Sequence, residues 1–226
     1  MTLQAIKKQP AEYLAAEYLR KQITTGEILP GTRLTETLLA EQLAISRGTL
    51  RIALHQLARE GLIVQTPYTG WASASIAPED LWELYTLRAA LESMAARLVC
   101  EQLDEKGIRE LNATYDELVR ACDHEKYHLI AEKDFMFHKK IVELAKNRRL
   151  VEHYRLVEQQ IRIFVASTYN CVTEPATVIE HHAPFLKALL DRDVDTSERL
   201  LREHAVSEGR KLYYHLTSQV DAEPDN

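Results

Sequence analysis

Most of the chain, from Pro78 to about Gln219, follows the hydrophobic period of amphipathic helices and has no alternating strand pattern. Each apolar stripe needs a partner surface, and short breaks between stripes return successive helices antiparallel to one another. The breaks fall at Asp104 and Gly107, at Asp123-His124, at Asn147, at Cys171 to Pro175, and at Asp191 to Asp193. This region is therefore predicted to form an all-α antiparallel bundle of about six helices.

Strand and turn signals are confined to the first part of the chain. Gly61–Gln65 and the Pro67–Gly70 turn before Trp71-Ala72-Ser73 predict a β-hairpin. Pro78, followed by two acidic residues, is typical of a helix start. Two domains are therefore expected, residues 1–75 and 76–226. The first carries eight Lys and Arg against six Asp and Glu, and the second 20 against 28, so the formal net charge of −6 combines a mildly basic and an acidic domain.

Composition excludes several classes of protein. Apolar residues make up 46% and charged residues 27%, with Gly and Pro at only 7 each, which excludes collagen, a coiled-coil rod and a disordered polymer. No apolar stretch is long enough to span a membrane, and the first ten residues lack the apolar core of a signal peptide, so a cytoplasmic protein is expected. The three Cys are far apart, which argues against a disulfide framework and a thiolate zinc site.

Three helices are predicted before the hairpin. Ala11–Thr24 has helical periodicity, and Thr35–Leu43 is a second, short helix. Ser46 caps a third helix from Arg47 to about Glu60. The second helix is expected to turn three leucines inward: Leu38, Leu39 and Leu43.

The third helix has a basic edge beside its apolar stripe. The stripe consists of Leu50, Ala53, Leu54 and Leu57. Arg47, Arg51 and His55 follow one another at four-residue intervals, and would face outward. Two helices joined by a short turn and followed by a hairpin predict a winged helix-turn-helix, whose third helix would enter the major groove of DNA. Alternatively, these Arg are ordinary solvated charges.

The segment from Pro30 to Gly70 resembles the DNA-binding domain of the GntR family of bacterial transcription regulators. The resemblance rests on Pro30-Gly31, Leu34, Glu36, Leu39-Ala40, Ser46-Arg47, Leu50-Arg51, Ala53-Leu54, Leu57, Glu60-Gly61-Leu62 and Gly70. It implies that Arg47 and Arg51 contact operator bases and phosphates, with Ser46, Gly48 and Thr49 as neighbours in the contact.

The chain departs from the family pattern at two places. Thr37 stands where many members have Arg, and Tyr68-Thr69 precede the wing glycine, Gly70, where many members have basic residues. Thr37, Tyr68 and Thr69 can donate hydrogen bonds to phosphate, but a hydroxyl releases no counterion. A shallow salt dependence of DNA binding is therefore expected.

Ionisable side chains lie on the apolar faces of the predicted bundle helices. Asp134 and His138 are four residues apart among Ile, Phe and Ala, and His182, His204 and Arg88 each lie in a Leu-rich stripe. A single inward His is typically a hydrogen-bonded core residue. One carboxylate and three imidazoles without a shared partner would be costly to bury, and a divalent cation satisfies all four. This set suits Zn²⁺, Ni²⁺, Co²⁺, Fe²⁺ or Mn²⁺ rather than Ca²⁺ or Mg²⁺.

Residues 78–215 resemble the FCD ligand-binding domain of the FadR-type GntR regulators, in its six-helix version. The resemblance rests on Leu84-Tyr85, Arg88, Leu91-Glu92, Ala95-Ala96, Asp134-Phe135, Phe137-His138, Asn147, His182, Phe185-Leu186, Ala188-Leu189, Asp193 and His204. It implies that Asp134, His138, His182 and His204 bind a divalent metal and that Arg88 and Tyr85 contact an effector. Zn²⁺ is the metal expected before the others.

The sequence thus predicts a DNA-binding transcriptional regulator, a repressor by the usual role of the family, that binds a pseudo-palindromic operator as a homodimer. Its effector would be a small carboxylate, such as a sugar acid, hydroxy acid or dicarboxylate. A regulator that senses the metal itself is one alternative, and a metal-dependent hydrolase or oxygenase is another. No enzyme is expected, because the inward residues include no positioned general base or nucleophile, and the likeliest candidates, Glu92 and Glu208, have other expected roles. Glu92 is expected to balance Arg88, and Glu208 to orient a His.

Overall fold

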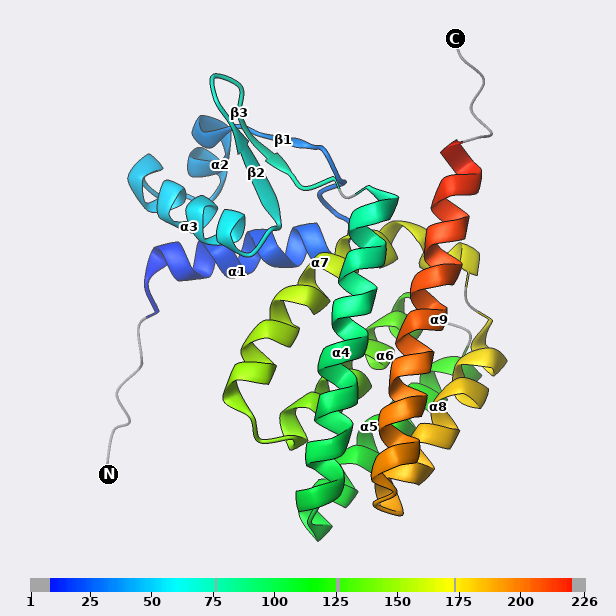
Figure 1. Ribbon diagram of the computed structural model, residues 1–226. Coiled ribbons are helices and arrows are strands. Elements are labelled where there is room, and N and C mark those ends of the chain that lie inside the picture. Colours follow the sequence, from blue (N-terminus) through cyan, green and yellow to red (C-terminus); the bar gives the residue numbers. More distant parts are fainter. Residues whose placement is uncertain (1–8, 76, 125–126, 173, 221–226) are drawn as a thin grey trace, which may run out of the picture. The chain divides into compact units, whose positions relative to one another are not determined.

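The structure, a computed structural model, describes residues 9–75, 77–124, 127–172 and 174–220. The chain divides into two compact units, Met1–Ser75 and Ile76–Asn226 (Figure 1). The described residues are mainly helical, with one small sheet in the first unit. This is the mainly α fold class that the sequence predicted.

The first unit is a winged helix-turn-helix. Its elements are α1 (Ala11–Thr24), β1 (Arg33–Leu34), α2 (Glu36–Gln42), α3 (Arg47–Arg59), β2 (Ile63–Thr66) and β3 (Gly70–Ser73). The antiparallel sheet has the order β1-β3-β2, with Trp71 of β3 opposite Leu34 on one side and Gln65 on the other. The indole of Trp71 is 2% exposed, so β3 joins the sheet to the core of the unit.

Local signals define both ends of α3. The hydroxyl of Ser46 accepts a hydrogen bond from the backbone N–H of Thr49 at 3.1 Å, which caps the first turn. Beyond the last turn Gly61 adopts a positive φ of 73°, and the N–H of Leu62 bonds the carbonyl of Leu57 at 3.0 Å. The predicted apolar stripe is fully buried: Leu50, Ala53, Leu54 and Leu57 each have 0% exposure.

One expectation for α2 is wrong. Leu38 was expected inside, but it is 53% exposed, and Ala40 is the buried residue of this helix. Leu39 and Leu43 are half-buried. Leu38 and Ala40 are two positions apart, which places them about 200° apart around the helix, so a helix that buries Ala40 must expose Leu38.

The second unit is a bundle of long helices. They are α4 (Pro78–Gln102), α5 (Glu105–Asp123), α6 (Tyr127–Leu144), α7 (Arg148–Val172), α8 (Pro175–Leu190) and α9 (Val194–Val220). The helices end and begin at the predicted breaks. At the first of these, the Oδ1 atom of Asp104 accepts a hydrogen bond from the N–H of Gly107 at 2.7 Å and caps α5.

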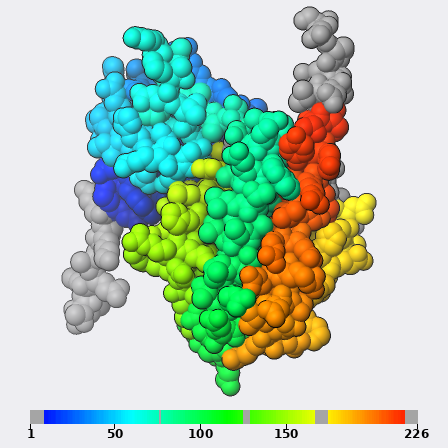
Figure 2. Space-filling model, in the orientation of Figure 1, coloured from blue at the N-terminus to red at the C-terminus, as the bar shows by residue number. Residues whose placement is uncertain are grey.

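Helices α4 and α9 run side by side along one face of the second unit (Figure 2). Their close approach depends on Gly209 of α9, because a Cβ added there would lie 2.5 Å from the Cβ of Tyr85 on α4. Together with α6 and α8, these helices surround the polar residues described below. No helix among the described residues is both long and apolar enough to cross a membrane.

Candidate functional site

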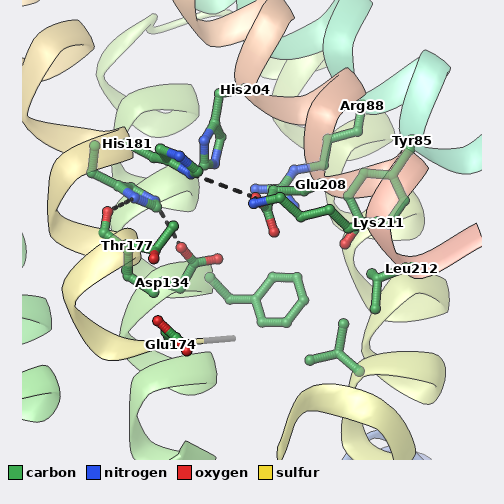
Figure 3. Close-up of a pocket in the computed structure, with 14 residues that line it drawn as sticks. Tyr85, Arg88, Asp134, Glu174, Thr177, His181, His204, Glu208, Lys211 and Leu212 are labelled. Atoms are coloured by element: carbon green, nitrogen blue, oxygen red, sulfur yellow. Dashed lines mark hydrogen bonds and ion pairs between the residues drawn. The ribbon is translucent and has the colours of Figure 1, made fainter. Parts of the chain in front are cut away.

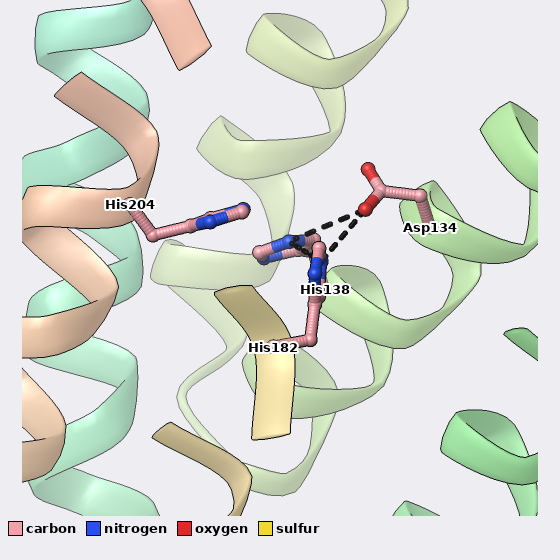
Figure 4. A group of neighbouring side chains, drawn as sticks. All are labelled: Asp134, His138, His182 and His204. Atoms are coloured by element: carbon pink, nitrogen blue, oxygen red, sulfur yellow. Dashed lines mark hydrogen bonds and ion pairs between the residues drawn. The ribbon is translucent and has the colours of Figure 1, made fainter. Parts of the chain in front are cut away.

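The structure brings together the Asp and three His that the sequence singled out (Figure 4). Asp134 and His138 come from α6, His182 from α8 and His204 from α9. One ligand atom from each of the four lies within 4.8 Å of the others. Nε2 of His182 lies 2.7 Å from Oδ1 of Asp134 and 3.1 Å from Nε2 of His138. Three separate helices therefore direct their nitrogen and oxygen atoms at one point.

Neighbouring acceptors orient two of the rings. Nδ1 of His182 donates to the backbone carbonyl of Val178 at 2.7 Å, which leaves Nε2 to face the cluster. Nδ1 of His138 lies 3.0 Å from Oε2 of Glu92, although it lacks the alignment of a strong hydrogen bond. Both rings therefore turn Nε2 toward the shared centre, which is the arrangement of metal-binding His residues backed by an oxygen acceptor.

The donor set fits a transition-metal ion. A tetrahedral ion at about 2.05 Å from each ligand holds its ligand atoms roughly 3.3 Å apart. The separations here scatter about that value, with 2.7 Å and 3.1 Å as above and 3.8 Å between Nε2 of His138 and Oδ1 of Asp134. Two imidazole nitrogens at 3.1 Å repel each other unless a proton or a cation lies between them. The cluster is therefore built to hold a positive charge.

Burial and neighbouring charges set the protonation states at the cluster. Burial lowers the pKa of His204 well below its usual value, and the adjacent rings of His182 and His138 lower it further. Burial alone would raise the pKa of Asp134, but the hydrogen bond to His182 and the positive charges nearby more than offset this and hold the pKa below its ordinary range. At neutral pH the cluster thus offers a carboxylate and a neutral imidazole.

A buried ion pair between Arg88 and Glu92 lies next to the cluster. Nε of Arg88 donates to Oε1 of Glu92 at 2.7 Å, and the hydroxyl of Tyr154 donates to the same oxygen at 2.8 Å. Arg88 is 3% and Glu92 0% exposed. Burial raises the pKa of Glu92, but the charge of Arg88 outweighs it and lowers this pKa to about 2. Nη2 of Arg88 is buried and has no hydrogen-bond partner among the described residues.

The structure shows the partners of Glu92 and Glu208, the two glutamates to which the sequence assigned supporting roles. The i, i+4 pairing of Glu92 with Arg88 is as predicted. Glu208 was expected to orient a His: its carboxylate contacts Lys211 at 2.7 Å and lies 3.8 Å from Nδ1 of His181, and one of its oxygens lies within 4.8 Å of ring nitrogens of His181 and His204. The carboxylate of Glu92 also lies beside the ring of His138, because α4 packs against α6.

A cavity of about 350 Å³ adjoins the cluster. Its walls include Arg88 and Tyr85, the predicted effector residues, and three of the four predicted metal ligands (Figure 3). The fourth, His138, lies behind them, fully buried. Sequence reasoning missed several other residues of the wall: Phe135, Val165, Glu174, Thr177, Val178, Lys211 and Leu212. Little in the sequence marks these residues, since most lie where an ordinary core or surface residue is also expected.

The residues predicted to contact DNA lie on exposed surfaces of the first unit. Ser46, Arg47 and Gly48 are exposed at the start of α3, and Thr49 is half-buried there. The side chain of Arg51, one turn further on, is 61% exposed. Elsewhere in the unit Thr37 is exposed on α2, and Thr69 and Gly70 are exposed at the hairpin. The structure thus leaves all of these side chains or backbone groups accessible, except for the partly covered Thr49.

Comparison with known sequences identifies both units. Residues 14–72 match the family described as "Bacterial regulatory proteins, gntR family", and residues 83–207 match the family described as "FCD domain". The Nta operon transcriptional regulator of Aminobacter aminovorans is 35% identical over 126 residues, which are 54% of this chain and 58% of that protein. The repressor RspR of Escherichia coli is 25% identical over 163 residues, 71% of this chain and 70% of that protein.

Solved structures share the fold. The Escherichia coli protein McbR/YncC aligns with a TM-score of 0.79 at 24% identity, over 92% of this chain and all (100%) of that chain. A transcriptional regulator from Rhodococcus sp. RHA1, described as a putative GntR protein, aligns with a TM-score of 0.77 at 21% identity, over 96% of this chain and 100% of that one. At these identities the likeness concerns the fold alone.

Proposed function

The chain belongs to the GntR family of bacterial transcriptional regulators and carries an FCD domain, and from this premise we propose that a small organic acid, bound beside a divalent metal in the second unit, controls its binding to operator DNA. The family and the named relatives are transcriptional regulators rather than enzymes. The observation that carries the proposal is the convergence of Asp134, His138, His182 and His204 beside a cavity that is also lined by Arg88, whose Nη2 has no hydrogen-bond partner among the described residues.

These four residues would hold the metal. Their nitrogen and oxygen atoms suit Zn²⁺ first, and Ni²⁺, Co²⁺, Fe²⁺ or Mn²⁺ next. The ion would add two positive charges to a buried site and accept an oxygen atom of the effector. Because carboxylate and imidazole groups bind a metal in their deprotonated forms, metal binding at this site is expected to weaken as the pH falls.

Arg88 would recognise the effector. Glu92 holds its Nε, so the guanidinium is fixed in place, while Nη2 keeps an unused donor in a buried position. The centre of the guanidinium also lies 5.6 Å from the ring centroid of Tyr85. A carboxylate can place one oxygen on the metal and the other on Arg88, which is a charge-assisted contact. The cavity volume of about 350 Å³ lies at the small end of ligand sites and suits an acid of a few carbon atoms.

The first unit would bind the operator. Arg47 and Arg51 would contact bases and phosphates, with Ser46, Gly48 and Thr49 beside them. Thr37, Thr69 and Gly70 would contact the DNA backbone. Because one recognition helix with two Arg contacts few bases, two copies of the chain are expected to bind a pseudo-palindrome. We assign the role of repressor, which is supported by the printed names of relatives such as RspR.

The metal site is tested by comparing two adjacent histidines. His182→Ala removes a proposed ligand, whereas His181→Ala changes a neighbour that also lines the cavity and is 39% exposed at its side chain. Elemental analysis of the purified proteins should find one metal ion per chain in the wild type and in His181→Ala, and none in His182→Ala. Circular dichroism and a gel-shift assay should show that His182→Ala is folded and still binds DNA. One ion per chain in His182→Ala would refute the assignment.

The effector is tested by isothermal titration of the metal-loaded protein with a panel of small carboxylates. Arg88→Lys keeps the charge but removes the planar donor pair, so it should weaken binding of the best acid by about 10- to 100-fold. Arg162→Lys is the control, because the guanidinium centres of Arg88 and Arg162 lie 5.8 Å and 4.1 Å from the ring centroid of Phe135, but Arg162 is absent from the cavity wall. Unchanged affinity in Arg88→Lys would count against the role of Arg88 in binding the effector.

A change of operator affinity with metal alone, at fixed buffer anion, would favour a metal sensor instead.

A further inference from the structure

The carboxylate of Glu36 joins three elements of the DNA-binding unit. Glu36 is the first residue of α2. Its Oε2 accepts a hydrogen bond from Nε of Arg51 on α3 at 2.7 Å, and its Oε1 accepts one from Nε1 of Trp71 on β3 at 2.9 Å. These partners are 15 and 35 residues away in the sequence. Both oxygens are thus engaged, one by the helix proposed to enter the groove and one by the strand behind it.

The strand side of this bridge is rigid. Trp71 is 2% exposed and is paired in the middle of the sheet. His55, one turn after Arg51 on α3, packs edge-on against the same indole with ring centroids 5.0 Å apart. The Glu36 side chain is therefore fixed at its Trp71 end by a buried group, and its other oxygen can restrain the mobile end of an exposed side chain.

The Arg51 side chain is 61% exposed, and only its Nε is engaged. Its two terminal nitrogens make no hydrogen bond to another described residue. A guanidinium reads a guanine edge or a phosphate with two N–H groups in one plane, and an unrestrained Arg loses side-chain entropy when it adopts that plane. A carboxylate at Nε fixes the plane of the guanidinium before DNA binds. Its negative charge also repels the phosphate backbone of DNA, whatever the base sequence.

From this geometry we propose that Glu36 is a positioning residue for sequence recognition, which presents the terminal nitrogens of Arg51 to the DNA in a fixed plane. The inference rests on the proposed function, because it presupposes that α3 contacts the operator. The bridge from Glu36 favours one orientation of the Arg51 guanidinium, and its negative charge weakens non-specific electrostatic binding to DNA. Its signature is therefore the ratio of specific to non-specific affinity rather than affinity alone.

The test compares Glu36→Gln with Glu41→Gln. Both changes remove one negative charge from α2, but Glu41 is exposed and its side chain has no hydrogen bond or ion pair with another described residue. In Glu36→Gln the new amide oxygen can still accept from Trp71, while the new NH2 group cannot accept from Arg51. Two labelled duplexes are titrated by fluorescence anisotropy: one selected by the wild-type protein from a randomised pool, and a scrambled version of it.

Glu36→Gln should lower the ratio of selected to scrambled affinity by roughly tenfold. Affinity for the scrambled duplex should stay equal or rise, because a repulsive charge is lost. Glu41→Gln should change the ratio by less than about twofold. In an Arg51→Ala background, Glu36→Gln should change the ratio no more than Glu41→Gln does, since the group that it positions is gone.

Three results would overturn the inference. If Glu36→Gln lowers both affinities equally, together with the thermal midpoint, the bridge only stabilises the fold. If it behaves like Glu41→Gln while Arg51→Ala weakens selected binding, Arg51 contacts DNA without help, and the proposed function stands. If Arg51→Ala leaves selected binding unchanged, both the positioning role and the proposed contact of Arg51 fail.

Discussion

Replacing Glu92 with Gln should destabilise the second unit far more than the same change at the surface. Glu92 is the counter-charge of Arg88, and both side chains are almost completely buried. Glutamine keeps the shape and can accept a hydrogen bond from Tyr154, but it leaves a buried guanidinium without a negative partner. The perturbation is therefore electrostatic rather than steric.

Two lines of reasoning give similar magnitudes. The fold lowers the pKa of Glu92 from 4.5 to about 2, and at about 1.4 kcal/mol per unit this shift corresponds to about 3 to 4 kcal/mol of folding free energy at neutral pH. Breaking a buried ion pair by removing one partner costs about 3 to 5 kcal/mol. Glu92→Gln should thus lower the free energy of unfolding by about 3 kcal/mol.

The pH dependence gives a second readout. A carboxylate whose pKa is lower in the folded state stabilises the fold above its unfolded pKa, near 4.5, and this stabilisation is lost as the pH falls toward 2. Glutamine does not titrate. The difference in stability between the wild type and Glu92→Gln should therefore be constant above about pH 5 and shrink steadily between about pH 4.5 and about pH 2.

The assay is equilibrium urea unfolding of the metal-free proteins, followed by far-ultraviolet circular dichroism at several pH values. Glu198→Gln is the matched control, because Glu198 of α9 pairs with Arg97 of α4 at 2.7 Å, yet the side chains of Arg97 and Glu198 are 40% and 23% exposed. The control should lose less than about 1 kcal/mol. A loss below about 1 kcal/mol in Glu92→Gln, or a pH-independent difference, would refute the reasoning.

Three further outcomes are expected. Gly209→Ala should lower the thermal midpoint and the free energy of unfolding, the latter by about 1 to 3 kcal/mol, because the new Cβ would lie 2.5 Å from the Cβ of Tyr85. A higher midpoint would mean that α4 and α9 separate easily. Arg47→Ala should cost roughly 1 to 3 kcal/mol in operator binding and relax specificity at one base pair, and an unchanged footprint and affinity would contradict its assignment. Thr37→Arg should steepen the plot of log affinity against log salt by about 0.9, through one added phosphate contact, and an unchanged slope would show that position 37 lies away from DNA.

Much of the fold follows from short stretches of sequence. The start of α3 at Ser46 and its end at Gly61 depend on a side-chain cap and a positive φ within a few residues. The inward faces of α6 and α8 follow from helical periodicity, which placed Asp134, His138 and His182 among apolar residues. Leu38 shows the limit of this reasoning, since a seven-residue helix offers too few apolar positions to fix which face turns inward.

The sequence by itself determined which helices form, which side chains of the long helices face the core, and that an unusual set of ionisable groups lies there. Only the tertiary structure decided which of these groups meet. Glu92 lies beside His138, Glu208 lies beside His181, Tyr154 donates to Glu92 although the two are 62 residues apart, and Glu36 joins Arg51 to Trp71. Periodicity and capping act over one or two helical turns, whereas the partner of an inward side chain depends on how helices distant in the sequence pack against one another.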